Sequence, residues 1–260
     1  MYFYTYTTII VKLCDFMSDF TLHLAGCNVG VSTLYDSTER YCKNYITDSA
    51  ADFSVIITQA DIDRERIKAA RQDESEGRLP RAVSDAFLEI TAVQRKIAEE
   101  LFLRDTLVFH GSVVAVDGEA YLFTAKSGTG KSTHTRLWRE LFGERAVMVN
   151  DDKPFLRMTE EGVIAYGSPW NGKHGLGSNI AVPLKAICIL ERAEVNHIQQ
   201  IPPVYALNML IQQSNRPVNG AMMGKYMELI DQLSRKVDFY RMGCNISLEA
   251  AKLAYETMSK

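Results

Sequence analysis

Residues 121–133 read Tyr121-Leu-Phe-Thr-Ala-Lys-Ser-Gly-Thr-Gly-Lys-Ser-Thr133. An apolar run typical of a β-strand leads into two glycines and a Lys-Ser pair, and a helix-favouring segment follows. This matches the phosphate-binding loop, or Walker A pattern, with Ala125 in place of its first glycine, and strand before and helix after are the context that the pattern requires. The glycines allow successive backbone N–H groups to converge on one anion, and the start of the helix adds a positive dipole. The stretch therefore predicts an α/β fold with a site for nucleotide phosphates.

The expected ligands of this loop are ATP and Mg²⁺. Lys131 is placed to reach the terminal phosphates, and the hydroxyl of Ser132 is placed to ligate magnesium. The alternative is a glycine-rich turn between a strand and a helix that binds nothing. The residues predicted to contact the nucleotide are Ser127, Gly128, Thr129, Gly130, Lys131, Ser132 and Thr133.

A second motif follows about one helix later. The apolar run of residues 146–149 ends in Asn150-Asp151-Asp152. If that strand lies beside the strand that precedes the loop, the two carboxyl ends share one edge of the sheet, where such proteins hold a metal ion. Successive residues of an extended segment point in opposite directions, so one aspartate can face the metal while the other acts as a base. The alternative is an ordinary Asn-Asp-Asp turn before Lys153 and Pro154.

These motifs together resemble those of the superfamily of HPr kinase/phosphorylase and phosphoenolpyruvate carboxykinase. The resemblance spans residues 110–182, under a third of the chain. Four stretches carry it: Ser127-Gly-Thr-Gly-Lys131, Phe109-His110-Gly111, Val149-Asn-Asp-Asp152, and Gly175-Leu-Gly177 with Asn179. The resemblance implies that Asp151 is the base for an acceptor hydroxyl, that Asp152 and Ser132 serve the magnesium ion, and that His110 lies in the phosphate pocket.

Where that family has an acidic residue and an arginine, this chain has Gly172, Lys173 and His174 within the glycine-rich residues 168–177. Such a loop can close over anionic oxygens. We therefore expect Lys173 to neutralise charge on the transferred phosphoryl group. The rival interpretation is an ordinary surface loop with Trp170 tucked under it.

The expected fold class is α/β, with a mixed sheet of the P-loop, HPr kinase-like kind flanked by helices and a small β-rich amino-terminal region. Alternating or β-branched runs predict strands at residues 2–13, 20–25 and 52–58. A polar segment at residues 72–80 predicts a linker, and Ser84 is positioned to cap a long helix. We therefore expect a region at residues 1–80 that contains the linker and a kinase-like domain at residues 81–260.

The composition limits the classes of binding partner that the chain is expected to have. The 260 residues are 47% hydrophobic and 23% charged, and 29 basic residues against 32 acidic ones give a net charge of −3. This balance argues against nucleic acid, whose partners carry a basic excess. No run of eighteen apolar residues or secretion signal is evident, and the five cysteines are irregularly spaced, so we expect a cytoplasmic protein with no membrane partner.

These expectations combine into one predicted function. The chain is expected to be a kinase that transfers the terminal phosphoryl group of ATP to a hydroxyl, either a serine of a protein or peptide or an alcohol of a small molecule. Two alternatives stay open: an ATP-binding sensor that transfers nothing, and a nucleotide hydrolase. The sequence also leaves the acceptor and the oligomeric state open, a homo-oligomer included.

Overall fold

The computed structural model describes residues 18–217 and 219–260 and divides the chain into two compact units. The first unit extends to Glu100, and the second is Leu101–Lys260. The strand predicted at residues 2–13 lies outside the described residues. Within the described part of the chain, no helix is both long enough and apolar enough to cross a bilayer.

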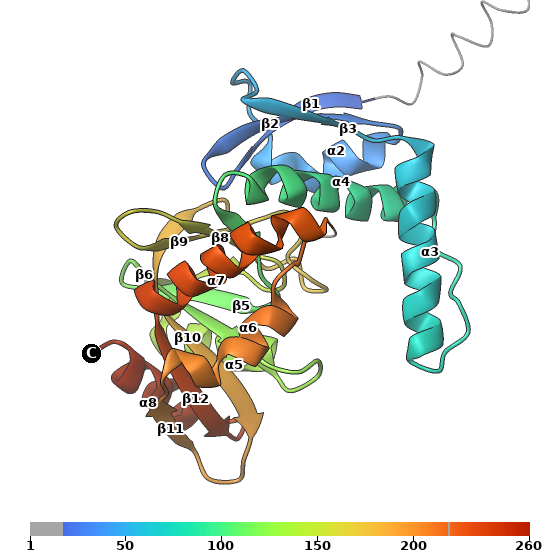
Figure 1. Cartoon of the computed structure of the whole chain (residues 1–260). Helices are drawn as coiled ribbons and strands as arrows, with labels where there is room; N and C mark the ends of the chain where they lie inside the picture. The colour runs from blue at the N-terminus through green and yellow to red at the C-terminus, as the bar shows by residue number, and fades with distance from the viewer. Residues whose placement is uncertain (1–17, 218) are drawn as a thin grey trace, which may run out of the picture. The chain divides into compact units, whose positions relative to one another are not determined.

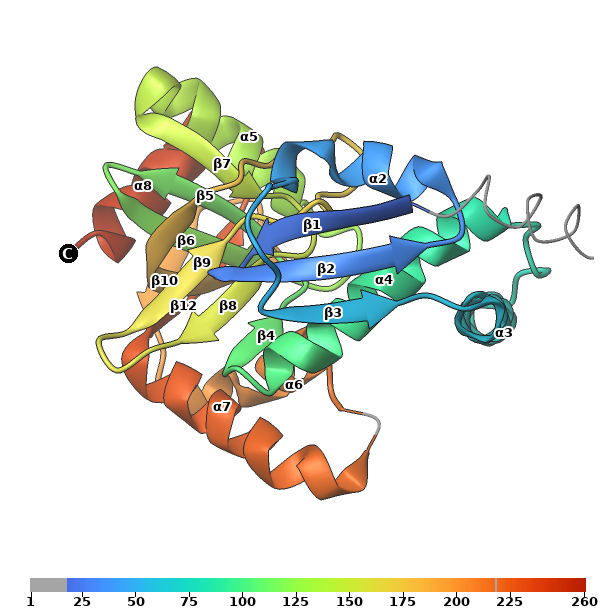
Figure 2. The same cartoon turned by 90° about the horizontal axis from the view of Figure 1, so that it is seen from above.

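A three-stranded sheet forms the core of the first unit (Figure 2). Strands β1 (Ser18–Leu24) and β2 (Cys27–Thr33) are antiparallel, and β3 (Phe53–Ile56) pairs with β2 in parallel. The hairpin between β1 and β2 turns through two residues with positive φ, Ala25 and Gly26, which matches the twist of the strands. The sequence analysis did not predict β2 or the short helix α2 (Asp36–Cys42) that follows it.

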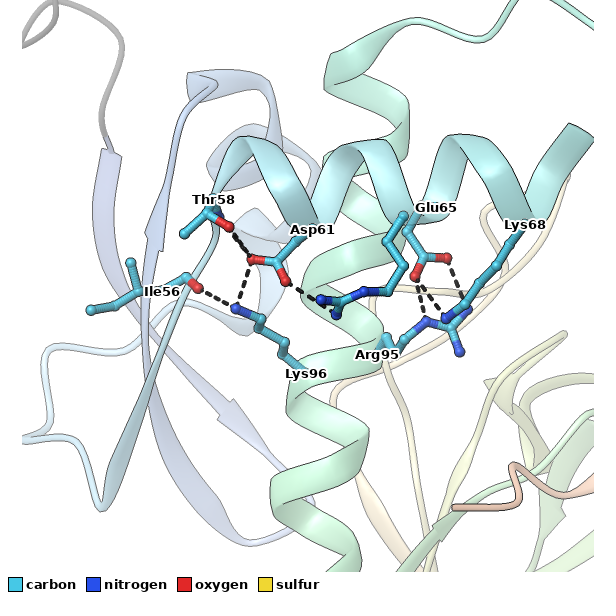
Figure 3. A network of polar contacts seen from close by, with 8 residues as sticks. Ile56, Thr58, Asp61, Glu65, Lys68, Arg95 and Lys96 are labelled. Carbon is cyan, nitrogen blue, oxygen red and sulfur yellow. Dashed lines mark hydrogen bonds and ion pairs between the residues drawn. The ribbon is translucent and has the colours of Figure 1, made fainter. Parts of the chain in front are cut away.

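Two long helices complete the first unit, α3 (Gln59–Ser75) and α4 (Asp85–Phe102), whose last two residues lie beyond Glu100. Ion pairs join them (Figure 3): Glu65 accepts hydrogen bonds from Arg95, and Asp61 pairs with Lys96 at 2.7 Å. Besides these charged side chains, α3 buries the apolar Ile62, so the helix packs without a continuous apolar stripe.

The start of α4 confirms the predicted cap, since the Ser84 hydroxyl accepts a hydrogen bond from the backbone N–H of Phe87. In the same helix, the buried carboxylate of Glu89 accepts hydrogen bonds from the backbone of Leu34 and from Thr38. These contacts tie α4 to the sheet region of the first unit. The domain boundary expected between residues 80 and 81 stays a prediction.

The second unit is built on a mixed sheet. Its strand order is β4-β8-β9-β10-β6-β5-β7, and β12 pairs with β10 and β11. The strands are β4 (Thr106–Val108), β5 (Ser112–Val116), β6 (Glu119–Thr124), β7 (Ala146–Asn150), β8 (Phe155–Met158), β9 (Val163–Tyr166), β10 (Ala181–Arg192), β11 (His197–Gln200) and β12 (Asp238–Cys244). Strands β6, β10 and β12 run parallel to one another.

Helices cover both faces of this sheet (Figures 1 and 2). On one face, α5 (Lys131–Phe142) and α8 (Leu248–Met258) bury Trp138 and Ala254 against Tyr121 and Phe123. On the other face, α6 (Leu207–Gln213) and α7 (Met223–Lys236) contribute to the core that contains Leu122 and Val149, through apolar side chains that include Leu210, Leu229, Ile230 and Leu233. A mixed α/β fold with a small β-rich amino-terminal unit is therefore confirmed.

One neighbour relation differs from the prediction, because β7 does not lie beside β6. The Asp117-Gly118 turn, with φ angles of 53° and 85°, joins β5 to β6 in a hairpin. Strand β7 therefore joins the outer edge of β5. Both β6 and β7 are antiparallel to β5, so their carboxyl ends still share one edge of the sheet. Residues 109–111 separate β4 from β5.

Candidate functional site

The glycine-rich loop joins β6 to α5, as its sequence predicts. Positive φ angles occur at Gly128 (76°) and Gly130 (123°) and not at Ala125, which is fully buried at the end of the strand. A Cβ atom at Gly128 would meet nothing within 4 Å. Backbone conformation, and not lack of space, therefore requires glycine at this position.

The loop is held from both sides. The backbone N–H and the hydroxyl of Thr129 both donate to the Lys126 carbonyl, at 3.2 and 2.8 Å. The guanidinium of Arg192, the last residue of β10, donates to the carbonyl of Gly128 at 2.6 Å and to that of Thr129 at 3.4 Å. Because Arg192 binds carbonyl oxygens of the loop, it favours a conformation in which the neighbouring N–H groups are available to an anion.

The side chain of Lys131 returns over the loop, where its ammonium lies 3.5 Å from the Ala125 carbonyl. Burial lowers the pKa of Lys131, and the charge of Lys153 acts in the same direction, while Asp152 and Asp151 oppose the shift. Both aspartates and both lysines are therefore close enough to interact electrostatically. This brings the loop and the predicted carboxylates into one site.

The turn after β7 is organised by Asn150. Its side-chain oxygen accepts hydrogen bonds from the backbone N–H groups of Asp152 and Lys153, at 2.9 and 2.7 Å. Its amide nitrogen donates to the carbonyl and to the hydroxyl oxygen of Ser168, both at 3.0 Å. The turn expected from Asn-Asp-Asp is thus present, and it fixes the directions in which the two aspartates point.

The two aspartates have different surroundings. Asp151 is 6% exposed and accepts a 2.6 Å hydrogen bond from the hydroxyl of Ser112, the first residue of β5. The Ser112 hydroxyl also lies 2.9 Å from that of Thr135, one turn into α5. Asp151 is therefore linked by side-chain hydrogen bonds to the helix that begins at Lys131.

Asp152 is half-buried and faces His110, with 3.4 Å between its Oδ1 atom and the imidazole Nε2 atom. Burial lowers the pKa of His110 to about 4, and the charges of Lys153 and Lys131 contribute to the same shift. The imidazole is therefore neutral at pH 7, and its approach to Asp152 is a polar contact and not an ion pair.

The glycine-rich residues 168–177 approach this turn through their backbone. The Lys153 N–H donates to the carbonyl of Trp170 at 3.0 Å, and a Cβ atom at Gly172 would lie 3.2 Å from the Cβ atom of Asp152. Trp170 is buried edge-on against Phe155. Lys173 is exposed, so the structure brings its loop to Asp152 without giving its side chain a partner in the site.

The donor set can be compared with what magnesium requires. Among residues 18–217 and 219–260, no group of three or more His, Cys, Asp or Glu side chains could hold a metal ion. Magnesium bound to a nucleotide needs only one or two protein oxygens, because phosphates and water supply the rest. Asp152, which is partly accessible, and Ser132, at the start of α5, are oxygen donors that fit that smaller requirement.

Sequence reasoning missed Ser112, Lys153 and Arg192 as members of the site. Ser112 follows His110 by two positions, and this closeness in sequence could have indicated it. Lys153 directly follows the aspartate pair. No sequence signal identifies Arg192, whose place depends on the pairing of β10 with β6.

The residues of this site lie within a region that matches a known protein family. The family model described as SynChlorMet cassette protein ScmC matches residues 83–249, which include the loop, the aspartate pair and Arg192. Among solved structures, the chain is similar to the Hpr(Ser) kinase/phosphatase from Coxiella burnetii, with 11% sequence identity and a TM-score of 0.36. That alignment covers 57% of this chain and 94% of the other. A comparison with curated proteins gives no match.

Proposed function

The chain belongs to the family of the SynChlorMet cassette protein ScmC, and we propose that it is a Mg²⁺- and ATP-dependent phosphotransferase with a hydroxyl acceptor. The observation that carries the proposal is the junction of the loop with the aspartate pair. Positive φ angles at Gly128 and Gly130 suit a loop whose N–H groups converge on an anion, and the Ser112 and Thr135 hydroxyls link Asp151 to the helix that begins at Lys131. Such a junction combines phosphate binding with a carboxylate base.

The proposal assigns phosphate binding and Mg²⁺ binding to different residues of the site. Loop amides and Lys131 bind the β- and γ-phosphates and stabilise negative charge in the transition state. Ser132 and Asp152 would hold Mg²⁺, which when bound supplies charge neutralisation at the phosphate oxygens. His110, neutral at pH 7 and 3.4 Å from Asp152, helps to orient that carboxylate.

Asp151 is assigned the role of the base that activates the acceptor hydroxyl. Its Oδ1 atom receives the Ser112 hydrogen bond, which leaves the second carboxylate oxygen to accept the proton of an incoming hydroxyl. The Ser112 and Thr135 hydroxyls hold Asp151 in register with α5 and hence with Lys131. Catalysis by such a site consists mainly of alignment and electrostatic stabilisation. Lys173, exposed in the neighbouring loop, is assigned to the transferred phosphoryl group.

A test of this function follows transfer of labelled γ-phosphate from ATP, with magnesium, to serine, serine-bearing peptides and small alcohols. The wild-type chain is expected to label one class of acceptor. Asp151→Asn is expected to abolish labelling while its affinity for ATP stays within about threefold, because the base acts in the transition state and not in ground-state binding. Asp231→Asn, on the exposed surface of α7, serves as the matched control.

The burial of Asp151 favours a second candidate, a module that binds ATP without transferring phosphate. A carboxylate that is 6% exposed and already bonded to Ser112 can also serve only to fix α5 on the sheet. In that case ATP binds and stays intact with every acceptor, and Asp151→Asn lowers thermal stability alone. Consumption of ATP without any acceptor, lost in Asp151→Asn, would instead indicate a hydrolase.

A further inference from the structure

A cavity of about 530 Å³ borders the glycine-rich loop, and neither Asp151 nor Asp152 is among its lining residues. Gly128, Thr129 and Gly130 form its boundary with the loop. Its remaining walls come from one face of α5 and from the turns that follow β10 and β12, with Leu137, Leu190, Ala193, Cys244 and Asn245 among the lining residues. Its volume is within the range of small-molecule sites, roughly 300–1,000 Å³.

The sheet topology explains why these segments meet. Strands β6, β10 and β12 are neighbours and parallel, with Thr124 opposite Ile189 and Arg192 opposite Cys244. Their carboxyl ends therefore lie along one edge, and ligands of open α/β sheets bind at this edge. The phosphate-binding loop follows β6, and the cavity lies over the ends of β10 and β12. A ligand anchored in the loop by its anionic end thus has the cavity directly beside it.

The walls suit a flat, mostly apolar group with polar edges. Leu137, Leu190 and Cys244 supply apolar surface, while Asn245 supplies an amide whose nitrogen donates to the Glu194 carbonyl at 2.9 Å. The Glu194 carbonyl can only accept a hydrogen bond, so it engages the amide nitrogen of Asn245. The Oδ1 atom of Asn245 then remains to accept a hydrogen bond from a ligand.

One further lining residue carries an unsatisfied buried group. His134 is 3% exposed, and its Nε2 atom accepts a hydrogen bond from the indole of Trp138 at 3.1 Å. Burial lowers the pKa of His134 to about 4, so the ring is neutral and its proton is on Nδ1. That Nδ1 donor has no hydrogen-bond partner within the described residues. The His134 ring is therefore a neutral part of the cavity wall.

We propose that this cavity holds the nucleoside, base and ribose, of the nucleotide whose phosphates bind the adjacent loop. The inference rests on the proposed function, because it takes the loop as the phosphate site. It adds the part of the ligand that the loop does not contact, and it assigns recognition of the base to the ends of β10 and β12. Neither segment belongs to a sequence motif.

The test compares two ligands, Mg-ATP and magnesium tripolyphosphate, by calorimetry. Ala193→Trp places an indole in the cavity wall, and Val195→Trp places the same side chain two residues further on, at an exposed position outside the cavity. Ala193→Trp is expected to weaken ATP binding about tenfold or more, equivalent to ~1.4 kcal/mol, and to leave tripolyphosphate binding unchanged. Val195→Trp is expected to bind both ligands like the wild type. GTP and CTP as further ligands define which base the cavity prefers.

A second measurement needs no substitution. Cys244 is a half-buried thiol in the cavity wall. Mg-ATP is expected to slow its alkylation by iodoacetamide, followed by peptide mapping, whereas tripolyphosphate is not. Equal ATP affinity in Ala193→Trp and the wild type, or no protection of Cys244 by bound ATP, overturns the nucleoside site while the phosphate site stands. If the wild type binds neither ligand, the proposed function fails with it.

Discussion

Ser112→Ala tests the coupling between the aspartate pair and the helix that follows the loop. The substitution removes the hydroxyl that donates to Asp151 at 2.6 Å and contacts Thr135 at 2.9 Å. A hydrogen bond to a charged group contributes about 1.5–3 kcal/mol, and its loss here leaves a buried carboxylate without that donor. We therefore expect a destabilisation of about 2–3 kcal/mol, which in a unit of this size lowers the melting temperature by roughly 5–10 °C.

The assay is thermal and urea unfolding of the wild type, Ser112→Ala and the control Ser234→Ala, whose hydroxyl bonds only a solvent-accessible carbonyl in α7. Phosphoryl transfer by Ser112→Ala is expected to fall about tenfold or more with ATP affinity nearly unchanged, since the base loses its anchor. In a double-mutant cycle with Asp151→Asn the two losses should not add, because the residues share one hydrogen bond. If Ser112→Ala unfolds and reacts like Ser234→Ala, the coupling between Asp151 and α5 is refuted.

Three further predictions concern the loop and its surroundings. Gly130→Ala forces an alanine to φ near 123°, a strain of about 1–3 kcal/mol, so its affinity for ATP in calorimetry should fall about tenfold. The control Gly143→Ala, at positive φ beyond α5, should bind ATP normally, and equal binding by both variants would exclude a conformational requirement at Gly130. Because burial depresses the pKa of His134 to about 4, the contribution of this residue to the free energy of unfolding is full above pH 6.5 and is lost as the pH falls toward 4. In urea unfolding, the free energy of unfolding of His134→Asn should therefore fall less over that pH range than that of the wild type, and an identical fall would contradict the assignment. Arg192→Met should weaken binding of both ATP and tripolyphosphate in calorimetry, because it releases the Gly128 carbonyl, whereas Arg235→Met on exposed α7 should have no effect.

Local sequence signals were sufficient to predict the loop, the strand before it and the helix after it. The strand, glycines and helix of residues 121–142 are contiguous, and the Asp117-Gly118 turn specifies its hairpin through two residues with positive φ. In the first unit, β2 and α2 were missed. Strand β2 contains Gly30, which weakens a strand pattern, and the N-terminal end of α2 depends on hydrogen bonds that Leu34 and Thr38 donate to Glu89, more than fifty residues away in sequence.

The contacts that assemble the candidate site are the part that the sequence does not specify locally. Ser112 and Asp151 are 39 positions apart and meet only because β5 lies between β6 and β7, a neighbour relation that the alternation of strands and helices leaves open. Arg192 reaches the loop because β10 pairs with β6. The roles assigned to the site residues stay predictions, and these residues are His110, Lys131, Ser132, Asp151, Asp152 and Lys173.

The most direct test of the central claim is calorimetry of Mg-ATP with the wild type, Lys131→Met and Lys126→Met. Both lysines belong to the same loop, but Lys131 folds back over it and is partly buried, whereas Lys126 is exposed. The account predicts that the wild type and Lys126→Met bind one Mg-ATP per chain and that Lys131→Met loses about tenfold or more in affinity. Absence of binding by the wild type, or equal binding by all three proteins, would contradict it.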